Sequence, residues 1–360
     1  MTTTNNNEHK KLNVPNLRFP EFQEEWEEYR IEDITVNISS GRCKSHSSNG
    51  KYNLYGSTGI IGKTDEACYE GNLVLVARVG ANAGFLQIIN EPCGITDNTL
   101  IIKPKEVDVQ YIYYFLQHFN LNRLIFGSGQ PLITGGMLKK VKVSLGTIQE
   151  QNKITRLLSI LDERITTQNK IIDKLQSLIK GIAQHCIREL INGWEYVRLG
   201  DICKITTGKL DANAQVENGQ YPFFTCAERP FNIDSYAFDT EALLISGNGA
   251  NLGYINYYKG KFNAYQRTYV LDHFSVNIQY VKWALKVLLP QRIAIEKSSS
   301  NTPYIVLSTL ADLKIPIPNN SKQNHIADLM MSFERKLSTQ LVLSDLYNKQ
   351  KQYLLRQMFI

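Results

Sequence analysis

The sequence predicts an α+β protein made of two similar mixed α/β domains that are separated by two long helices. Three observations predict it: the sequence is duplicated at an offset of about 170 positions, each copy mixes strand-like and helix-like patterns, and a heptad repeat follows each copy. The length of 360 residues suits this plan, since a domain takes roughly 150 residues. The chain has no apolar run long enough for a membrane-spanning helix, so we expect a globular fold.

Each copy opens with the same motif. Trp26-Glu-Glu-Tyr-Arg-Ile-Glu-Asp-Ile34 returns as Trp194-Glu-Tyr-Val-Arg-Leu-Gly-Asp-Ile202. A short strand-like stretch that ends at a glycine, Gly41 or Gly208, follows the motif in each half. The first domain is therefore predicted to begin close to Trp26 and the second close to Trp194.

A buried strand and a glycine-rich turn come next in each copy. Residues 72–85 parallel residues 241–254, and Gly80, Asn82 and Gly84 each recur 169 positions later. Apolar runs that end in glycines are typical of a buried strand entering a turn. Asn82 and its counterpart can either shape this turn or reach a ligand from it.

An amphipathic helix and a final strand complete each copy. Residues 109–116 match residues 278–285, with apolar side chains at three- and four-residue spacing. The polar turn Ser128-Gly-Gln-Pro131 then corresponds to Ser300-Asn-Thr-Pro303, and the strand-like residues 141–143 correspond to 313–315. The predicted organisation is a flexible lead-in (1–21), a first domain (22–147), a long helix (148–191), a second domain (192–319) and a second long helix (320–360).

The heptad repeats predict that the two long helices form an antiparallel coiled coil within the chain. Apolar residues alternate at spacings of four and three, as at the a and d positions of a coiled coil. Beyond Gln340 the repeat weakens, and Leu341, Leu346 and Leu355 suggest a shifted apolar stripe. The predicted seam consists of Ile154, Leu158, Leu161, Ile165, Gln168, Ile172, Leu175, Ile179, Ile182 and Cys186 in the first helix, and Ile326, Met330, Phe333, Leu337 and Gln340 in the second.

An ordinary amphipathic helix that packs only on its own domain is the alternative for each repeat. A helix of about 40 residues rises ~60 Å, which exceeds the width of a small domain, so part of each seam needs another partner. Antiparallel pairing would put the domains at opposite ends, related by a pseudo-twofold axis. Charged residues outside the seam, Glu163, Arg164, Glu334 and Arg335, are candidates for docking partner proteins or are solvated.

Composition excludes several classes of protein. The six cysteines are widely spaced without a CxxC pair, and no His or Cys residues have the spacing of zinc ligands, so we expect reduced thiols and no metal site. The N-terminal residues lack the apolar region of a secretory signal, so we expect a cytoplasmic protein. The net charge of +6 permits a polyanionic partner without requiring one.

Taken in order, these motifs resemble the specificity subunit of type I restriction-modification systems. The resemblance rests on the duplicated Trp-Glu-x-x-Arg-[Ile/Leu]-x-Asp-Ile motif, on the paired glycine turns, and on Gln151-Asn-Lys-Ile154 echoed by Gln323-Asn-His-Ile326. It covers nearly all of residues 20–360. It implies a non-catalytic chain whose two target recognition domains each read one half of a split, asymmetric site in double-stranded DNA.

The resemblance also implies partners. Two modification (methyltransferase) subunits would dock on the helices and methylate adenine, and restriction endonuclease subunits would cleave DNA with ATP. S-adenosylmethionine, ATP and Mg²⁺ are then expected in the partner subunits and not in this chain. The rival interpretation is a coiled-coil scaffold whose α/β domains bind proteins.

Polar residues on predicted loops are the candidate DNA contacts. The segments 52–59 and 221–228, which share almost no identity beyond the first tyrosine, are predicted to be loops that read different half-sequences. Arg, Asn and Gln can hydrogen-bond base edges in two places at once, whereas Lys mostly meets phosphate. A solvated surface charge is the alternative at each position, and Tyr55, Phe85, Phe223 and Tyr254 are expected in the core. The candidates are Arg42, Lys44, Ser57, Thr58, Lys63, Arg78, Asn82, Ser128 and Gln130 in the first domain, and Lys209, Arg229, Asn248, Asn251, Arg267, Ser299 and Asn301 in the second.

Catalytic motifs are not supported. Ser57-Thr-Gly-Ile-Ile-Gly-Lys-Thr64 nearly matches the phosphate-binding P-loop, but serine replaces the first glycine and an acidic stretch follows. The histidines are scattered, and the signature by which adenine methyltransferases hold a flipped base is missing. We therefore expect no catalytic residue in this chain.

Overall fold

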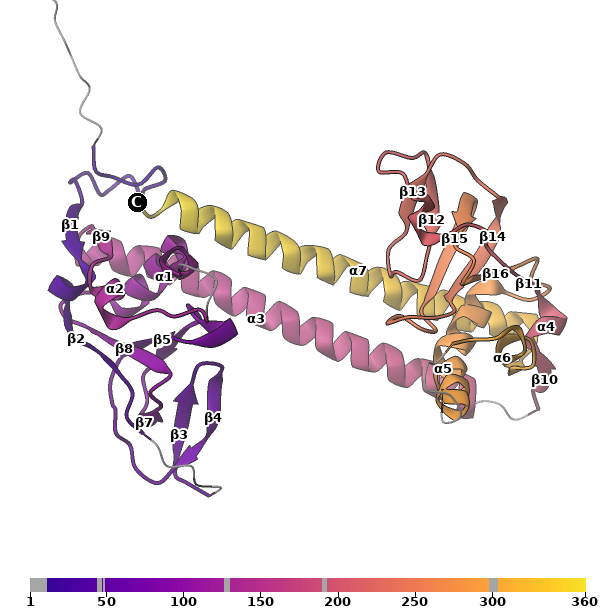
Figure 1. Cartoon of the computed structure of the whole chain (residues 1–360), viewed down its shortest axis with the longest axis horizontal. Helices are drawn as coiled ribbons and strands as arrows, with labels where there is room; N and C mark the ends of the chain where they lie inside the picture. Colours follow the sequence, from indigo (N-terminus) through magenta and orange to yellow (C-terminus); the bar gives the residue numbers. More distant parts are fainter. Residues whose placement is uncertain (1–11, 44–46, 48, 126–129, 190–192, 298–303) are drawn as a thin grey trace, which may run out of the picture. The chain divides into compact units, whose positions relative to one another are not determined.

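The computed structural model describes residues 12–43, 47, 49–125, 130–189, 193–297 and 304–360 (Figure 1). The chain divides into two compact units. Unit 1 contains the chain up to Asn169 together with Leu343–Ile360, and unit 2 contains Lys170–Val342. Each unit holds mixed sheets and helices, and each long helix passes from one unit to the other, so the predicted fold class is confirmed.

Unit 1 is built on three small sheets. A four-stranded antiparallel sheet has the order β2 (Thr35–Ser40), β8 (Thr99–Pro104), β5 (Leu73–Ala77) and β6 (Leu86–Ile89). A three-stranded sheet has the order β4 (Gly59–Thr64), β3 (Tyr52–Gly56) and β7 (Cys93–Ile95), and β1 (Glu27–Arg30) pairs with β9 (Lys142–Leu145). Helices α1 (Val109–Phe119) and α2 (Gly135–Lys139) complete the unit.

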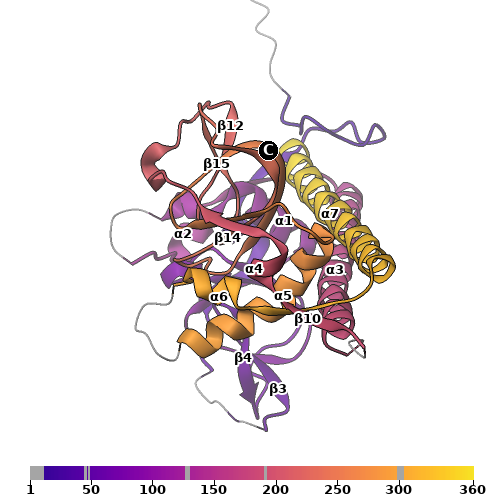
Figure 2. The same ribbon diagram turned by 90° about the vertical axis from the view of Figure 1, so that its right-hand side faces the viewer.

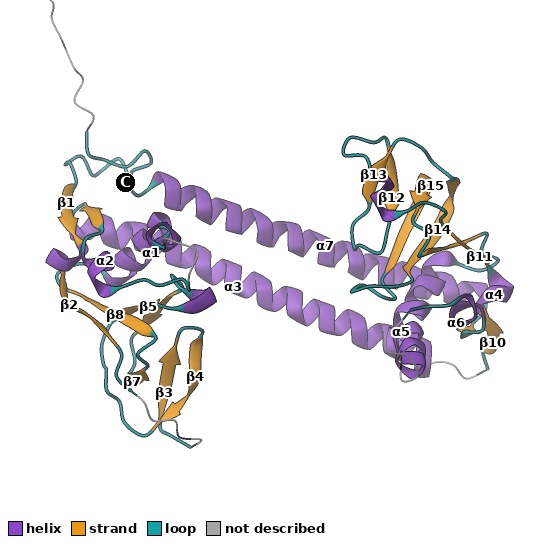
Figure 3. Cartoon of the chain, in the orientation of Figure 1, coloured by secondary structure: helices purple, strands orange, loops and turns teal. Residues whose placement is uncertain are grey.

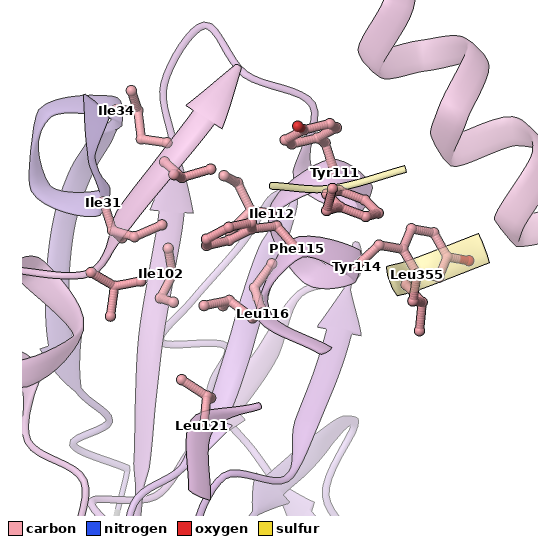
Figure 4. Close-up of a cluster of buried hydrophobic side chains, with 14 of the residues drawn as sticks. Ile31, Ile34, Ile102, Tyr111, Ile112, Tyr114, Phe115, Leu116, Leu121 and Leu355 are labelled. Atoms are coloured by element: carbon pink, nitrogen blue, oxygen red, sulfur yellow. The ribbon is translucent and has the colours of Figure 1, made fainter. Parts of the chain in front are cut away.

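The central strands of the four-stranded sheet of unit 1 are buried on both faces. Side chains alternate between the faces of a strand, so Val74 and Val76 of β5 pack against α1, while Leu73 and Leu75 pack toward β7. Figure 4 shows the first of these clusters, in which Ile112 and Phe115 of α1 are directed at the sheet. This two-sided burial explains why β5 is a continuous apolar run.

Unit 2 repeats this plan with a larger sheet. Its six strands have the order β11 (Lys204–Thr207), β16 (Thr268–Asp272), β14 (Phe238–Ser246), β15 (Ile255–Ala264), β12 (Tyr221–Phe224) and β13 (Phe231–Ile233). Strand β10 (Glu195–Arg198) pairs with β17 (Lys314–Ile317), and the helices are α4 (Leu199–Ile202), α5 (Ile278–Lys297) and α6 (Leu307–Ala311). Figure 2 shows α5 and α6 lying together within this unit.

One interruption explains why unit 1 has two sheets where unit 2 has one. Strand β15 runs unbroken, whereas the corresponding segment of unit 1 is divided into β6 and β7 by residues 90–92. Pro92 lies in this gap and has no backbone N–H for a ladder, and Gly71, on the segment that faces the gap, has a φ of +100°. The pairing resumes at the bridge between Tyr69 and Cys93, so the register of the duplicated strands is retained.

The segments at 52–59 and 221–228, which we predicted as loops, are largely strands. Residues 52–56 form β3, which pairs in parallel with β7, and residues 221–224 form β12, which pairs in parallel with β15. Leu54 and Phe223 are fully buried at equivalent places in these pairs. Backbone pairing does not require matching side chains, so the low identity between the copies concealed a shared structure.

The long helices are α3 (Ile148–Gln184), which ends in a π-helical turn (His185–Glu189), and α7 (Asn320–Gln357) (Figure 3). In unit 1 Lys351 Nζ lies 2.6 Å from Asp162 Oδ1, and Ser344 Oγ lies 3.1 Å from Asn169 Oδ1. The two contacts are seven residues apart on each helix but in opposite chain directions, so the segments run antiparallel. In unit 2 both helices contribute to one apolar cluster, which includes Leu175, Ile179, Ile326, Met330, Phe333 and Leu337.

The expected shift of the apolar stripe beyond Gln340 is confirmed only at Leu355. Leu341 and Leu346 are exposed, while Leu354 and Leu355 are buried against the core of unit 1. The seam instead continues through polar residues such as Lys351, which find polar partners on α3. Of the other predicted seam residues of α3, Ile154, Leu158, Leu161, Gln168, Ile172 and Cys186 are buried, and Ile165 and Ile182 are half-buried.

A duplicated glutamine fixes the start of each long helix. Gln151 donates to Gly146 O (2.9 Å) and accepts from the Asp108 N–H (3.3 Å). Gln323 repeats these bonds with Pro318 O (2.8 Å) and the Asn277 N–H (3.0 Å). Each glutamine therefore joins its long helix to the start of α1 or α5.

Candidate nucleic-acid interface

Most of the described candidate DNA-binding residues of unit 1 lie at one edge of the four-stranded sheet, where the strands end. The ends of β2 and β5 meet the start of β8 there, because Ser40 pairs with Leu100 and Ala77 pairs with Thr99. Arg42 lies just beyond β2, and Arg78 and Asn82 lie just beyond β5. We call this edge, formed by residues 41–43, 78–85, 96–98 and 130–133, the reading edge of unit 1. The reading edge of unit 2 is formed by residues 208–210, 247–254, 265–267 and 304–305.

The two reading edges share one backbone scaffold. The Ala77 N–H donates to Phe85 O (2.9 Å) in unit 1, and the Ser246 N–H donates to Tyr254 O (3.0 Å) in unit 2. Five further backbone N–H to carbonyl bonds are equivalent in the two units. In unit 1 they run from Arg78 to Asn98, Ala83 to Gly80, Gly84 to Ala77, Phe85 to Asn82 and Ile133 to Arg78. In unit 2 they run, in the same order, from Gly247 to Arg267, Leu252 to Gly249, Gly253 to Ser246, Tyr254 to Asn251 and Ile305 to Gly247. The duplicated backbone thus presents different side chains from the same positions.

Glycine is required in both turns. Gly80 and Gly84 have φ values of +76° and +90°, and their counterparts Gly249 and Gly253 have +79° and +81°. L-residues with a Cβ rarely adopt this left-handed conformation. Glycine at these positions therefore allows both turns to adopt the same left-handed backbone conformation.

The polar candidates of unit 1 are exposed or half-buried. Arg42, Thr58, Lys63, Asn82 and Gln130 are exposed, and Ser57 and Arg78 are half-buried. The Arg78 Nε atom is buried without a hydrogen-bond partner among the described residues. Since a buried donor favours a hydrogen-bond acceptor, the Arg78 guanidinium is suited to meet one at this edge.

Ser57 and Thr58 form the turn between β3 and β4. The Gln87 side chain of β6 donates to Gly56 O (3.0 Å), and the Thr96 N–H donates to Tyr55 O (3.0 Å), so this turn is tied to the reading edge. Lys63 lies at the other end of the hairpin, where it pairs with Asn53 across the strands. The structure therefore brings Ser57 and Thr58 to the reading edge but not Lys63.

Lys63 belongs to a polar network on the flank of the hairpin. Its Nζ donates to Asn53 Oδ1 (2.9 Å), and Glu91 accepts from Asn53 (2.6 Å) and from the Tyr55 hydroxyl (2.7 Å). Hydrogen bonds from Asn53 and Tyr55 lower the pKa of Glu91, and burial and then Glu91 raise the pKa of Tyr55 to about 12. Because Lys63 and Thr64 lie on a strand and no helix follows them, the P-loop alternative is wrong.

In unit 2 two candidate asparagines, Asn248 and Asn251, form hydrogen bonds within the reading edge. Asn251 Nδ2 donates to Cys226 O (3.0 Å), and Asn248 Oδ1 accepts from Cys226 Sγ (3.0 Å). These bonds tie the segment after β12 to the glycine turn. Asn251 therefore shapes the interface, as the alternative interpretation of this residue held, whereas Asn82 is exposed.

The basic candidates of unit 2 are free to meet a ligand. Lys209, Arg229 and Arg267 are exposed. The two neighbours of Lys209 are bonded to the segment around Arg267. The Gly208 N–H donates to Thr268 O (3.3 Å), and Leu210 O accepts from the Gln266 N–H (2.9 Å). Lys209 therefore lies beside Arg267 in the reading edge. The candidates Lys44, Ser128, Ser299 and Asn301 lie outside the described residues.

The expectation that Phe85 and Tyr254 are core residues is wrong, because both are exposed at equivalent places in the reading edges. Phe223 is buried and Tyr55 is half-buried. Sequence reasoning also missed Leu132 and its counterpart Tyr304, which are exposed beside buried isoleucines. The signal that could have found them is the repeated order of a proline, a large apolar residue and an isoleucine, Pro131-Leu132-Ile133 and Pro303-Tyr304-Ile305, in which neighbouring side chains of an extended segment face opposite sides.

The candidate docking charges on the helices have different surroundings. Glu334 accepts hydrogen bonds from Lys282 (2.7 Å) and Lys286 (3.0 Å) of α5, so it holds its own unit together. Glu163, Arg164 and Arg335 are exposed. Within the described residues, no helix is long and apolar enough to span a membrane, and no cluster of His, Cys, Asp and Glu side chains is suited to a metal ion.

Comparison with known proteins identifies the family. The sequence profile described as type I restriction modification DNA specificity domain matches residues 23–177 and again residues 191–342. The chain belongs to this family. The duplicated reading edges fall one in each matched region, so the family assignment agrees with the internal repeat.

Relatives of this family differ in how much of the chain they match. The Escherichia coli type I restriction enzyme EcoDI specificity subunit is 44% identical over 135 residues, which cover 38% of this chain and 30% of that protein. The MjaIX specificity subunit of Methanocaldococcus jannaschii is 25% identical over 293 residues, 69% of this chain and 67% of the relative. The fold matches the crystal structure of a type I restriction-modification S subunit from M. genitalium with a TM-score of 0.73 at 19% identity, covering 96% of this chain and 99% of that one.

Proposed function

We propose that this chain is the DNA sequence-recognition subunit of a type I restriction-modification complex and reads a bipartite, asymmetric site in double-stranded DNA. The observation that carries the proposal is the pair of reading edges, which have the same backbone hydrogen bonds but different side chains. A scaffold repeated with different side chains suits two unequal half-sites, as a symmetric dimer suits a palindrome.

The chemistry of the reading edges supports contact with a duplex. Arg42 and Arg78 in unit 1 and Arg267 in unit 2 can form paired hydrogen bonds with guanine or bind phosphate, and Lys209 can bind phosphate. Gln130 and Asn82 can pair with adenine. These side chains extend from loops fixed at the ends of a sheet, where a rigid scaffold positions contact residues.

The partner subunits supply the chemistry in this proposal. Two modification subunits methylate adenine within the site, and restriction endonuclease subunits cleave DNA with ATP, all in the cytoplasm. S-adenosylmethionine, ATP and Mg²⁺ bind those subunits, and this chain contributes no catalytic residue. Its exposed helix surfaces, including Glu163, Arg164 and Arg335, dock the partners.

Exchange of one domain tests the proposal. Residues 193–318 are replaced by the equivalent segment of another family member, and methylated sites are mapped in DNA from cells that also carry the modification subunit. We expect one half of the methylated sequence to change and the other half to stay. An unchanged sequence would contradict the assignment of one reading edge to each half-site.

Salt dependence separates DNA reading from the scaffold alternative. A complex that makes several phosphate contacts should lose roughly tenfold or more in affinity for a duplex between low and moderate salt, because bound cations are released from DNA. Absence of duplex binding at any salt concentration would favour a protein-binding scaffold.

A further inference from the structure

Each reading edge carries two exposed apolar side chains at equivalent positions. Phe85 is 50% exposed and Leu132 is 41% exposed in unit 1, and their counterparts Tyr254 and Tyr304 are 40% and 55% exposed in unit 2. We call these four side chains the apolar tips. Single exposed apolar residues are common, but the same pair at the same edge of two units calls for a shared cause.

The backbone fixes the direction of Leu132 and Tyr304. The Gly80 N–H donates to Pro131 O (3.0 Å) and the Ile133 N–H donates to Arg78 O (2.8 Å), so residues 131–133 pair with the turn as a short strand. Ile133 is fully buried, and neighbouring side chains of an extended segment point in opposite directions, so Leu132 points away from the core.

Tyr304 is held in the same way in unit 2. The Ile305 N–H donates to Gly247 O (2.8 Å), and Ile305 O accepts from the Tyr269 hydroxyl (2.9 Å). Ile305 is buried. The exposed side chain of Tyr304 therefore follows from the anchoring of its neighbour.

Phe85 and Tyr254 follow the left-handed glycines of the two turns. Their N–H groups donate to Asn82 O (2.9 Å) and to Asn251 O (3.0 Å). Both side chains thus extend from a turn closed by its own hydrogen bonds. The strands β6 and β15 pair directly after them, from Leu86 and Ile255 onward.

We infer that the apolar tips contact the 5-methyl groups of thymines in the major groove, so that each half-site contains a thymine read by its own unit. This inference rests on the proposed function. The reading edges otherwise present cations and amides, which suit phosphates and polar base edges. The thymine methyl is the apolar group that base pairs offer in the major groove, and it is therefore the complement of an exposed apolar side chain there.

Replacement of thymine by uracil tests the inference without altering the protein. The complex of this chain with its modification subunit is titrated with a duplex that carries the mapped site, and each thymine of the recognised bases is replaced by uracil in turn. We expect affinity to fall about fourfold at one or more positions in each half-site, which is the effect of losing one buried methyl group. If no uracil replacement weakens binding, the inference is overturned.

Matched variants assign the contact to particular residues. Leu132→Ala should weaken binding at least about fourfold, should leave the salt dependence unchanged, and should reduce the effect of uracil in the half-site of unit 1 only. Tyr304→Ala should do the same for the other half-site. Val36→Ala is the control, because Val36 is an exposed apolar residue of β2 at the end remote from the reading edge.

The outcomes distinguish this inference from the proposed function. A wild-type complex with no preference for the mapped site over an unrelated duplex would refute the proposed function. A preserved preference, with Leu132→Ala and Tyr304→Ala behaving like Val36→Ala, would refute the apolar contact alone. A lower salt dependence in either variant would also refute it, since it would indicate a lost phosphate contact.

Discussion

At equivalent positions on the two long helices, a carboxylate accepts hydrogen bonds from the helix that packs against the sheet, α1 or α5. Asp162 of α3 accepts from the Tyr114 hydroxyl of α1 (2.9 Å), and Glu334 of α7 accepts from Lys282 (2.7 Å) and Lys286 of α5. Burial alone would raise the pKa of Glu334, but the two lysines lower it below its ordinary value. The partner residues therefore differ between the units, although in both units a carboxylate connects the long helix to the helix that packs against the sheet.

This residue predicts how unit 2 responds to acid. Because the pKa of Glu334 is lowered in the folded state, its charge stabilises the fold above the ordinary glutamate value near 4.3, and this stabilisation is lost as pH falls through the lower folded pKa. Glu334→Gln should cost about 1–3 kcal/mol at pH 7, since the largely buried Lys282 loses its carboxylate. The cost should shrink as pH falls through the lowered folded pKa of Glu334, because the wild-type carboxyl is then also protonated.

Thermal or denaturant unfolding between pH 3 and 8 measures this effect. Glu163→Gln is the matched control, because Glu163 is an exposed glutamate of α3, and it should change stability by less than about 0.5 kcal/mol. A gap between wild type and Glu334→Gln that stays constant across the whole range would show that the charge of Glu334 is not responsible.

At the scale of elements, the sequence predicted what depends on apolar spacing and on glycine. The duplicated strands, the amphipathic helices and the seam up to Gln340 follow from these two signals. The later part of the seam could not be predicted this way, because Lys351 and Ser344 occupy it through polar contacts with Asp162 and Asn169 that an apolar pattern does not record. The pairing of β3 with β7 and of β12 with β15 was missed, because backbone hydrogen bonds do not require the two copies to have identical residues.

The glycine that ends β11 predicts a strong effect of a single methyl group. A Cβ at Gly208 would lie 1.9 Å from the backbone oxygen of Ala264, so the strand end and the segment beside it approach too closely for any other residue. Gly208→Ala should cost unit 2 about 3 kcal/mol or more, because backbone must move to relieve the clash. Gly181→Ala in α3 meets nothing within 4 Å and should stabilise the helix by about 0.5–1 kcal/mol. Denaturant unfolding of the two variants checks this, and similar stability of both would contradict the close approach.

At the scale of the whole molecule, the duplication predicted two units but not how the chain divides between them. Each long helix contributes residues to both units, so the compact units do not coincide with the sequence repeats. Most exposed candidates lie in the reading edges because strand ends gather there, and this convergence follows from the strand order of the fold, which the sequence analysis did not predict. Leu132 and Tyr304 were missed because apolar residues were assigned to the core, and only the pairing of residues 131–133 and 305 with the turns shows that they point outward.

Two reading edges with separate scaffolds should contribute independently to DNA binding. Arg42 and Arg267 lie in different units and share no hydrogen-bond partner among the described residues, so the free-energy costs of Arg42→Gln and Arg267→Gln should add within about 0.5 kcal/mol in the double variant. Each variant should lower the salt dependence by about one phosphate contact if its arginine binds phosphate, or relax only its own half-site if it binds a base. Titrations of the complex with the mapped duplex at several salt concentrations measure both effects.

The matched controls are Lys103→Gln and Lys204→Gln, which remove exposed cations from the ends of β8 and β11 remote from the reading edges. Both should leave affinity nearly unchanged. A coupling above about 1 kcal/mol between the two arginines would mean that the units do not read DNA separately, because independent sites do not alter one another's contacts.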